Sequence, residues 1–215
     1  MLIIFVLILV LMFLINYGIY WILYLKNPDQ NNKFWKLYTK VYLFFWGFPL
    51  ICIPILSSSF LSPLFGTPSY FREYWIWFLI IGIIFLGTTF KLAKETLEIN
   101  KNRGLSKGKY PLITKGPYEI MRHPMYSAWA LCYIGLAFVF DSLMALLIAP
   151  FFILFLILES YLEEKYLLIP QFGEKYINYM KKTLNRLFPP PYNTLLFIIA
   201  LFVVYIGILN FPYIF

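Results

Sequence analysis

Long apolar runs without a single charged residue constrain this chain more than any other feature. They cover residues 2–25, 41–60, 74–90, 125–140, 143–158 and 195–215. An α-helix rises about 1.5 Å per residue, so about 20 residues cross a hydrocarbon core of about 30 Å. With 61% hydrophobic and only 13% charged residues, the composition is also far from that of a soluble domain. We therefore predict an all-α, polytopic bundle of about six transmembrane helices.

The connections between these runs refine the prediction. The first run is expected to be a transmembrane helix and not a secretion signal, because no basic region precedes it and no small-residue cleavage site follows. Pro49 and Pro54 should kink the second helix. Asp141 and Ser142 leave room for only a tight turn, so the fourth and fifth helices should form an antiparallel hairpin.

The basic residues predict the orientation of the bundle. The net charge is +8, and the segments 26–40, 91–124 and 159–190 hold four, eight and five of the eighteen Lys and Arg residues. Six crossings place these three segments on one side, and cytoplasmic loops collect basic residues. We expect all three to be cytoplasmic and both termini to be outside. This distribution explains the charge without any binding of nucleic acid.

Few residue types are available for metal or nucleophilic chemistry. The two cysteines, Cys52 and Cys132, lie inside apolar runs, and His123 is the only histidine. No CxxC pair and no metal-ligand spacing is present, so neither a disulfide framework nor a metal site is expected. No Ser-His-Asp set and no phosphate-binding loop is visible either.

Two polar segments at cytoplasmic helix ends hold the candidate binding residues. In the first, a Gly-Pro turn is followed by Arg122 and His123. Pro124 suits the first turn of the next helix, where free N–H groups attract a carboxylate. Arg122 could add a bidentate contact, and Tyr118 and Tyr126 offer flat faces for an aromatic base.

The second segment begins with Glu163 and Glu164 at the end of the fifth helix. A carboxylate there could bind an ammonium group or a ribose hydroxyl, so the two segments together suit a zwitterionic nucleoside. Taken singly, the residues have ordinary explanations. The basic pair can be an interfacial anchor, the tyrosines interfacial aromatics, and the glutamates a solvated helix face.

Four motifs in order favour the binding hypothesis. They are Arg-His-Pro-Met-Tyr at 122–126, Glu-Glu at 163–164, Phe-Gly-x-x-Tyr-x-x-Tyr at 172–179 and Arg-Leu-Phe-Pro at 186–189. Over about residues 110–189 the chain resembles the isoprenylcysteine carboxyl methyltransferase family and its phospholipid methyltransferase relatives. The resemblance implies an integral membrane enzyme. It would transfer a methyl group from S-adenosylmethionine, in a pocket formed by the 91–124 loop and the 159–190 segment, to a lipophilic acceptor from the bilayer.

The resemblance also implies which residues contact S-adenosylmethionine or its product S-adenosylhomocysteine. Glu164 is the favoured glutamate, and Glu163 stays an alternative because the spacing to Phe-Gly is one residue longer than usual. Arg122 and Glu163 are candidates for a catalytic part, although the reaction mainly needs alignment of the substrate. The implied cofactor-binding residues are Tyr110, Pro111, Leu112, Ile113, Tyr118, Arg122, His123, Pro124, Met125, Tyr126 and Glu164.

Two departures from the family pattern bear on the acceptor. In prenylcysteine enzymes an arginine shortly before the cofactor glutamate is thought to meet the substrate carboxylate, whereas residues 159–161 here are Glu-Ser-Tyr. This weakens a prenylcysteine acceptor relative to a phospholipid headgroup amine or another small lipophile. The apolar run 195–215 is also not a general family feature.

Three units are expected along the chain. Residues 1–90 form three N-terminal transmembrane helices, 91–190 the catalytic core, and 191–215 an additional C-terminal helix. Two other functions compete with methyl transfer. One is an NADPH-dependent membrane reductase of the sterol-reductase type, and the other is a non-catalytic membrane scaffold.

Overall fold

The computed structural model of the chain describes residues 2–26, 47–48, 51–58, 75–101 and 111–209. All regular secondary structure in these ranges is helical, which confirms the predicted all-α class. Most of the predicted second helix, the loop 26–40 and the candidate Tyr110 lie outside the described residues.

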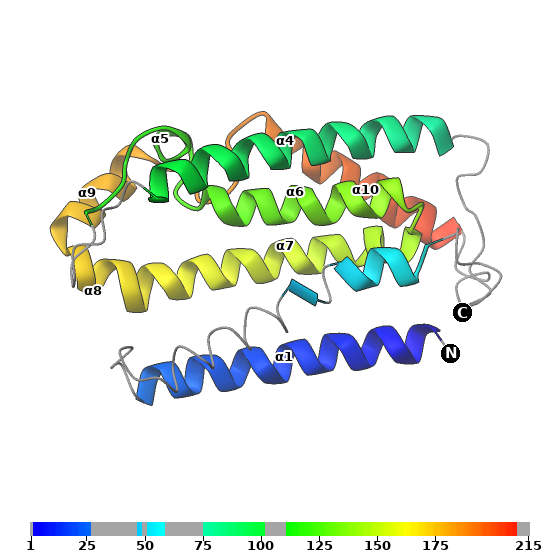
Figure 1. The fold of residues 1–215 in the computed structure, drawn as a ribbon, viewed down its shortest axis with the longest axis horizontal. Helices are drawn as coiled ribbons and strands as arrows, with labels where there is room; N and C mark the ends of the chain where they lie inside the picture. Colours follow the sequence, from blue (N-terminus) through cyan, green and yellow to red (C-terminus); the bar gives the residue numbers. More distant parts are fainter. Residues whose placement is uncertain (1, 27–46, 49–50, 59–74, 102–110, 210–215) are drawn as a thin grey trace.

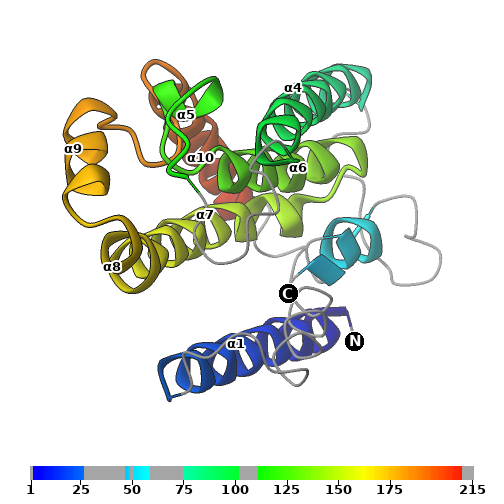
Figure 2. The same cartoon turned by 60° about the vertical axis from the view of Figure 1, so that its left-hand side comes forward.

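Five long helices correspond to the apolar runs. Their axes are roughly aligned in Figure 1, and α7 lies between α6 and α1 in both Figure 1 and Figure 2. The α4 helix continues beyond the apolar run, past Phe90 to Lys101. The helices are α1 (Leu2–Lys26), α4 (Trp75–Lys101), α6 (Pro124–Val139), α7 (Leu143–Glu163) and α10 (Tyr192–Leu209).

The helices α6 and α7 form the expected hairpin. Asp141 adopts a positive φ of 48° in the turn, and Ser142 caps α7 because its hydroxyl accepts a hydrogen bond from the Ala145 N–H at 3.1 Å. Beyond Glu163 the chain does not leave the helical path. It continues through a π-helical turn and a short helix before the amphipathic helix α9. These elements are η2 (Glu164–Leu168), α8 (Ile169–Phe172) and α9 (Glu174–Lys182).

Small residues bring α4 and α6 into close contact. A Cβ atom added at Gly82 would lie 2.9 Å from the Gly135 carbonyl oxygen and 2.9 Å from the Val139 nitrogen. A side chain at this position would therefore push the two helix backbones apart. Along α6, Ala130, Tyr133 and Ala137 face a core shared with α7 and are almost fully buried.

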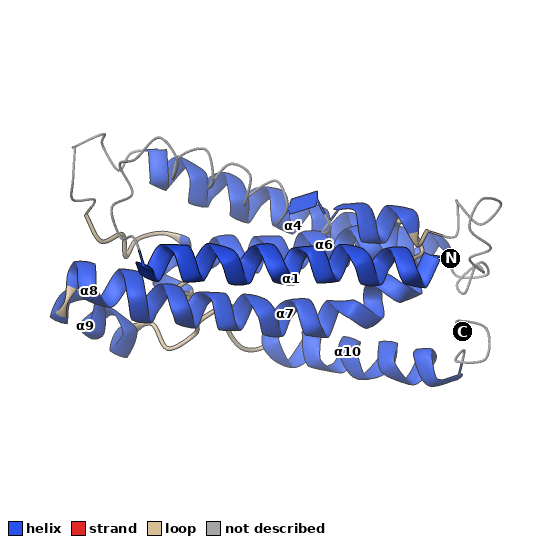
Figure 3. Cartoon of the chain, turned by 90° about the horizontal axis from the view of Figure 1, so that it is seen from below, coloured by secondary structure: helices blue, strands red, loops and turns tan. Residues whose placement is uncertain are grey.

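Large apolar side chains cover the outer faces of α1, α4 and α10, which are seen together in Figure 3. Leu7, Trp77 and Phe90 are exposed by 61%, 63% and 71%, and Phe197 on α10 by 62%. Apolar surface of this extent is unusual on a soluble monomer and is expected where helices face lipid.

Two helices in the described part of the chain are long and apolar enough to cross a membrane: Trp75–Lys101 and the continuous helical stretch Leu143–Phe172. Three shorter apolar helices accompany them, at Leu7–Leu23, Pro124–Val139 and Tyr192–Ile206. The described N- and C-terminal ends lie at one end of the bundle, whereas α5 (Pro117–Ile120), α8 and α9 lie at the other (Figure 1). The candidate site lies at this second end.

Candidate functional site

A glycine turn positions the first predicted segment. Gly116 has a φ of 63°, which favours glycine, and a Cβ atom there would come within 2.6 Å of Ile99 Cδ1 on α4. The turn leads into the single helical turn of α5, and the Glu119 side chain accepts a hydrogen bond from the Gly116 N–H at 3.3 Å. The chain is extended at Met121 and enters α6 at Pro124, the N1 position that the sequence predicts.

The segment after α9 holds this first segment in place through backbone hydrogen bonds. The Arg122 N–H donates to the Asn185 carbonyl and the His123 N–H to the Arg186 carbonyl, each at 3.0 Å. The Tyr179 hydroxyl donates to the Tyr118 carbonyl at 2.7 Å. The Arg-His-Pro motif and the Arg-x-x-Pro motif are therefore neighbours in space, although about 60 residues separate them in the sequence.

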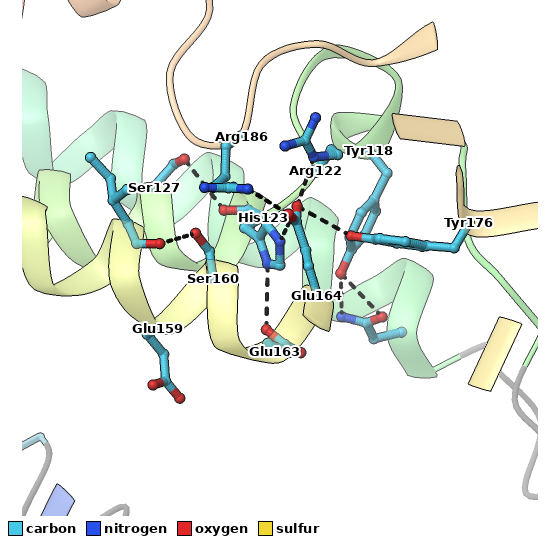
Figure 4. Close-up of polar contacts among 12 residues, drawn as sticks. Tyr118, Arg122, His123, Ser127, Glu159, Ser160, Glu163, Glu164, Tyr176 and Arg186 are labelled. Atoms are coloured by element: carbon cyan, nitrogen blue, oxygen red, sulfur yellow. Dashed lines mark hydrogen bonds and ion pairs between the residues drawn. The ribbon is translucent and has the colours of Figure 1, made fainter. Parts of the chain in front are cut away.

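Glu164 is the centre of a buried charge cluster (Figure 4). Its Oε1 atom accepts from Arg122 Nε at 2.7 Å and lies 3.0 Å from His123 Nε2, while Oε2 accepts from Arg186 Nη2 at 2.7 Å. The Tyr176 hydroxyl adds a longer contact to Oε1 at 3.4 Å. Only 2% of Glu164 is exposed, so protein groups satisfy this carboxylate almost completely.

Glu163 lies at the edge of the same cluster and is more accessible. Its Oε2 atom is 3.4 Å from His123 Nδ1, and 30% of its side chain is exposed. His123 therefore bridges the two glutamates, one at each ring nitrogen. The Tyr126 ring stacks on the His123 ring, with centroids 5.4 Å apart and planes 3° apart.

The cluster changes the acid–base properties of the groups around it. Burial lowers the pKa of His123, but hydrogen bonds and charge attraction from Glu163 and Glu164 outweigh this effect and raise the pKa above its ordinary value. Burial raises the pKa of Tyr176, and the neighbouring charge of Glu164 raises it further. The pKa of Tyr179 is raised as well, chiefly by burial. Both phenols are thus held neutral as hydrogen-bond donors.

Comparison with known proteins gives a match to a segment that contains most of this cluster. The family model of the phospholipid methyltransferases matches residues 74–175, from the start of α4 into α9. The matched segment makes up just under half of the chain. No curated protein and no solved structure matched the chain.

The match confirms the predicted resemblance over this segment, and the matched family is one of enzymes that methylate phospholipids. The matched segment contains Arg122, His123 and both glutamates, whereas Arg186 and the helices α1 and α10 lie outside it. In the described part of the chain, no group of three His, Cys, Asp or Glu side chains is arranged to hold a metal ion.

The structure brings five of the predicted site residues together: Arg122, His123, Tyr126, Glu163 and Glu164. The other described candidates lie in the segment 111–118 and in the first turn of α6. Tyr118 is half-buried and its hydroxyl hydrogen-bonds the Asn100 side chain on α4 at 3.2 Å, and Pro124 and Met125 form the first turn of α6. In the irregular segment before α5, Leu112 and Ile113 are half-buried and Pro111 is exposed.

Arg186 and Tyr176 were not among the predicted site residues, although both stand in the quoted motifs. Arg186 binds Glu164 as closely as Arg122 does. Its Nε atom is buried and donates to no acceptor among the described residues. The terminal Arg-x-x-Pro motif was the signal for this residue, because a motif arginine near a buried glutamate is expected to pair with it.

Proposed function

We propose that this protein transfers a methyl group from S-adenosylmethionine to a lipid-type acceptor at the cytoplasmic membrane surface. The observation that carries the proposal is the convergence of the Arg-His-Pro, Glu-Glu and Arg-x-x-Pro segments in one buried cluster, at one end of an apolar helical bundle. The match of residues 74–175 to the phospholipid methyltransferase family model supports the reaction type.

The residues of the cluster fit the methionine part of the cofactor. That part carries a carboxylate and an ammonium group next to the sulfonium. The Arg186 Nε donor is buried and has no acceptor in the part of the chain that the structure describes, which is costly unless a ligand supplies one. A carboxylate satisfies this donor and is attracted by the Arg122 charge beside it. Tyr118 and Tyr126, in the segment before α6 and in its first turn, supply aromatic faces for the adenine ring.

The two glutamates take different parts in this proposal. Glu164 already binds both arginines and His123, so it orders these side chains for the ligand. Glu163 has a partly exposed carboxylate whose partners are His123, at 3.4 Å, and Tyr126, and no arginine pairs with it among the described residues. It is therefore the better partner for the cofactor ammonium group. This assignment selects the alternative that the motif spacing left open. A ligand that bound Arg122 and Glu164 directly would first have to break their ion pair.

The reaction requires alignment more than acid–base chemistry. Bound S-adenosylmethionine supplies a methyl group on a positively charged sulfur, which is already an activated leaving group. The chain's own residues hold the nucleoside and exclude water from the reacting centre. The arginines and Glu164 beside that centre neutralise one another's charges. The paired side chains of the cluster are pre-organised for these tasks.

We infer the membrane topology from the charge distribution and the arrangement of helices. Six spans with the 26–40, 91–124 and 159–190 segments in the cytoplasm place both termini outside. Consistent with this, the described terminal ends lie opposite the charge cluster (Figure 1). Within this topology, residues 1–90 anchor the enzyme, 91–190 carry out catalysis and 191–215 add a further helix.

A cofactor panel tests the proposal. In isothermal titration calorimetry of the detergent-solubilised protein, S-adenosylhomocysteine should bind and raise the melting temperature, and NADPH should do neither. The Glu163→Gln variant should bind S-adenosylhomocysteine at least about tenfold more weakly, because a charge-assisted contact is lost. Its melting temperature should stay near that of the unaltered protein.

The other results separate the competing functions. A response to NADPH with none to S-adenosylhomocysteine would identify a reductase of the sterol-reductase type. No response to either ligand would favour a membrane scaffold. Unchanged affinity of the Glu163→Gln variant would remove Glu163 from the proposed cofactor site.

A further inference from the structure

Glu159 is a buried carboxylate that the charge cluster does not use. It lies on α7 one turn before Glu163, and only 7% of the residue is exposed. In Figure 4 its side chain points away from Glu164 and from the two arginines, toward the other side of α7. It therefore needs an explanation separate from that of the cluster.

The partner of Glu159 comes from the N-terminal helix. The Trp21 Nε1–H group donates a hydrogen bond to Glu159 Oε2 at 2.9 Å, across 138 positions of the sequence. Trp21 is itself 7% exposed and lies in the last two turns of α1. The contact brings α1, which lies outside the family match, to the same end of α7 as the charge cluster.

The charge of Glu159 is poorly compensated. Glu159 forms no ion pair with any described residue, whereas Glu163 and Glu164 both do. The Trp21 N–H group and the Tyr17 hydroxyl beside this carboxylate are both neutral donors. Neutral donors alone do not balance the cost of burying a carboxylate. Such a group is stabilised when a cation binds beside it.

The surroundings of Glu159 are suited to an organic cation. Trp21 packs against Tyr17 and Tyr20, and its ring lies 6.2 Å from the Tyr166 ring. The faces of Trp and Tyr rings attract alkylammonium groups, and a neighbouring carboxylate adds to this attraction. Apolar residues of the same cluster, Leu162 among them, provide contacts for an acyl chain.

We propose that Glu159, oriented by Trp21, anchors the cationic head of the methyl acceptor in a site between α1 and α7. This assignment rests on the proposed methyl transfer and specifies its acceptor as a lipophilic amine. It makes Glu159 a specificity-determining residue: a carboxylate acceptor is repelled and an ammonium is bound. Glu163, one turn further along α7, places the cofactor site next to this acceptor site.

The carboxylate also provides for the proton that an amine acceptor must lose. The ammonium nitrogen gives one proton to a Glu159 carboxylate oxygen and regains its lone pair. This lone pair forms the new N–C bond while the C–S bond of the sulfonium breaks, and the electron pair of that bond stays on sulfur. The methylated nitrogen carries the positive charge, and Glu159 later releases its proton to water.

Ligand binding to the full chain in phosphatidylcholine nanodiscs tests the site. Tritiated octadecylamine is displaced with unlabelled octadecylamine, octadecanol or octadecanoate. The unaltered protein should prefer the amine over the alcohol of the same length. The Glu159→Gln variant keeps the acceptor for Trp21 but loses the charge, so its amine affinity should fall at least about tenfold. The matched Glu98→Gln variant, at an exposed acid on α4, should bind like the unaltered protein.

Each sample is also titrated with S-adenosylhomocysteine, whose affinity should be the same in all three proteins. Equal amine affinity in Glu159→Gln and the unaltered protein would overturn the proposal and leave the Trp21 contact a purely structural one. If the Glu159→Gln variant folds poorly, the preference of the unaltered protein for octadecylamine over octadecanol decides the test. Equal affinity of the unaltered protein for these two ligands would overturn the proposal that the site recognises the positive charge. Missing S-adenosylhomocysteine binding with a retained amine preference would instead defeat the proposed methyl transfer.

Discussion

The two ends of the α6–α7 hairpin are closed by different kinds of interaction. At the turn, Ser142 binds the Ala145 N–H through its hydroxyl and the Ala137 carbonyl through its own N–H, so these partners lie three and five residues away. At the other end, Glu164 binds Arg122 and Arg186, which lie 42 and 22 positions away in the sequence. The capping contacts at the turn are local, and the long-range contact of Ser142, with the Ser57 hydroxyl, joins two neutral groups. The site end is instead held by long-range contacts between charged groups.

This difference shows where the chain concentrates costly interactions. A hydroxyl at a helix start contributes a modest stabilisation and needs no distant partner. A buried ion pair requires desolvation of both charges and is stable only when every partner is in place. A chain that needed only a hairpin could have closed both ends with caps, so the charged end is explained by the ligand that we propose it binds.

The largest effect is expected from Glu164→Gln. This change leaves the buried Arg122 and the partly buried Arg186 without their shared counter-charge. Removing one partner of a buried pair costs about 3–5 kcal/mol, so thermal unfolding in detergent should occur at a much lower temperature. S-adenosylhomocysteine binding should be lost in the same variant, because the arginines lose their orientation.

An exposed pair provides the control for this comparison. Glu98 lies 4.0 Å from Lys94 on α4, with side chains 59% and 61% exposed. Pairs of this kind contribute about 0.3–0.5 kcal/mol, so Glu98→Gln should hardly change the unfolding temperature. Similar losses for the two variants would mean that the cluster at Glu164 is as solvated as the surface pair.

The fold was largely predictable because each apolar run is long and free of charge. The runs predicted α1, α4, α6, α7 and α10, and Asp141-Ser142 predicted the hairpin turn. The apolar run ends at Leu158, whereas α7 continues to Glu163. The charged residues that follow do not end the helix, because their side chains reach partners on other segments while the backbone stays helical through Phe172. Six crossings remain a prediction from charge and length.

The candidate site was predictable as a set of residues but not as a set of contacts. The motifs selected Arg122, His123 and the two glutamates, which do meet in space. Sequence patterns did not show that Arg122 and Glu164 would bind each other, since that depends on how the segment at 183–186 packs beside Arg122. The contact between Glu159 and Trp21 was not predictable for the same reason, because the two residues are 138 positions apart and no sequence pattern links them.

A change of pH is expected to have an intermediate effect on the unfolding temperature, and this effect should come from the end of the hairpin that contains Glu164. The pKa of His123 is raised in the folded protein by Glu163 and Glu164, despite its burial. A group with a raised folded pKa contributes its full stability below the unfolded pKa of about 6.5 and loses it as the pH rises through the folded pKa. The unfolding temperature should therefore fall as the pH is raised above neutrality.

The His123→Gln variant isolates this contribution. Glutamine retains polar contacts with the glutamates but does not titrate, so the variant should lose most of the decline measured between about pH 6.5 and 9. The same decline in both proteins would assign the pH dependence to other groups, because His123 would then make no pH-dependent contribution to stability in this range.

The smallest effect is expected at the turn. Ser142→Ala removes the hydroxyl that accepts from the Ala145 N–H and that also hydrogen-bonds the Ser57 hydroxyl. Loss of such a cap costs about 1 kcal/mol, and a thermal melt should show a small decrease in the unfolding temperature. S-adenosylhomocysteine affinity should not change, because the turn lies at the opposite end of α6 and α7 from Arg122 and Glu164. Weaker binding in this variant would show that the hairpin transmits strain along its length, and the two ends could then no longer be treated as independent.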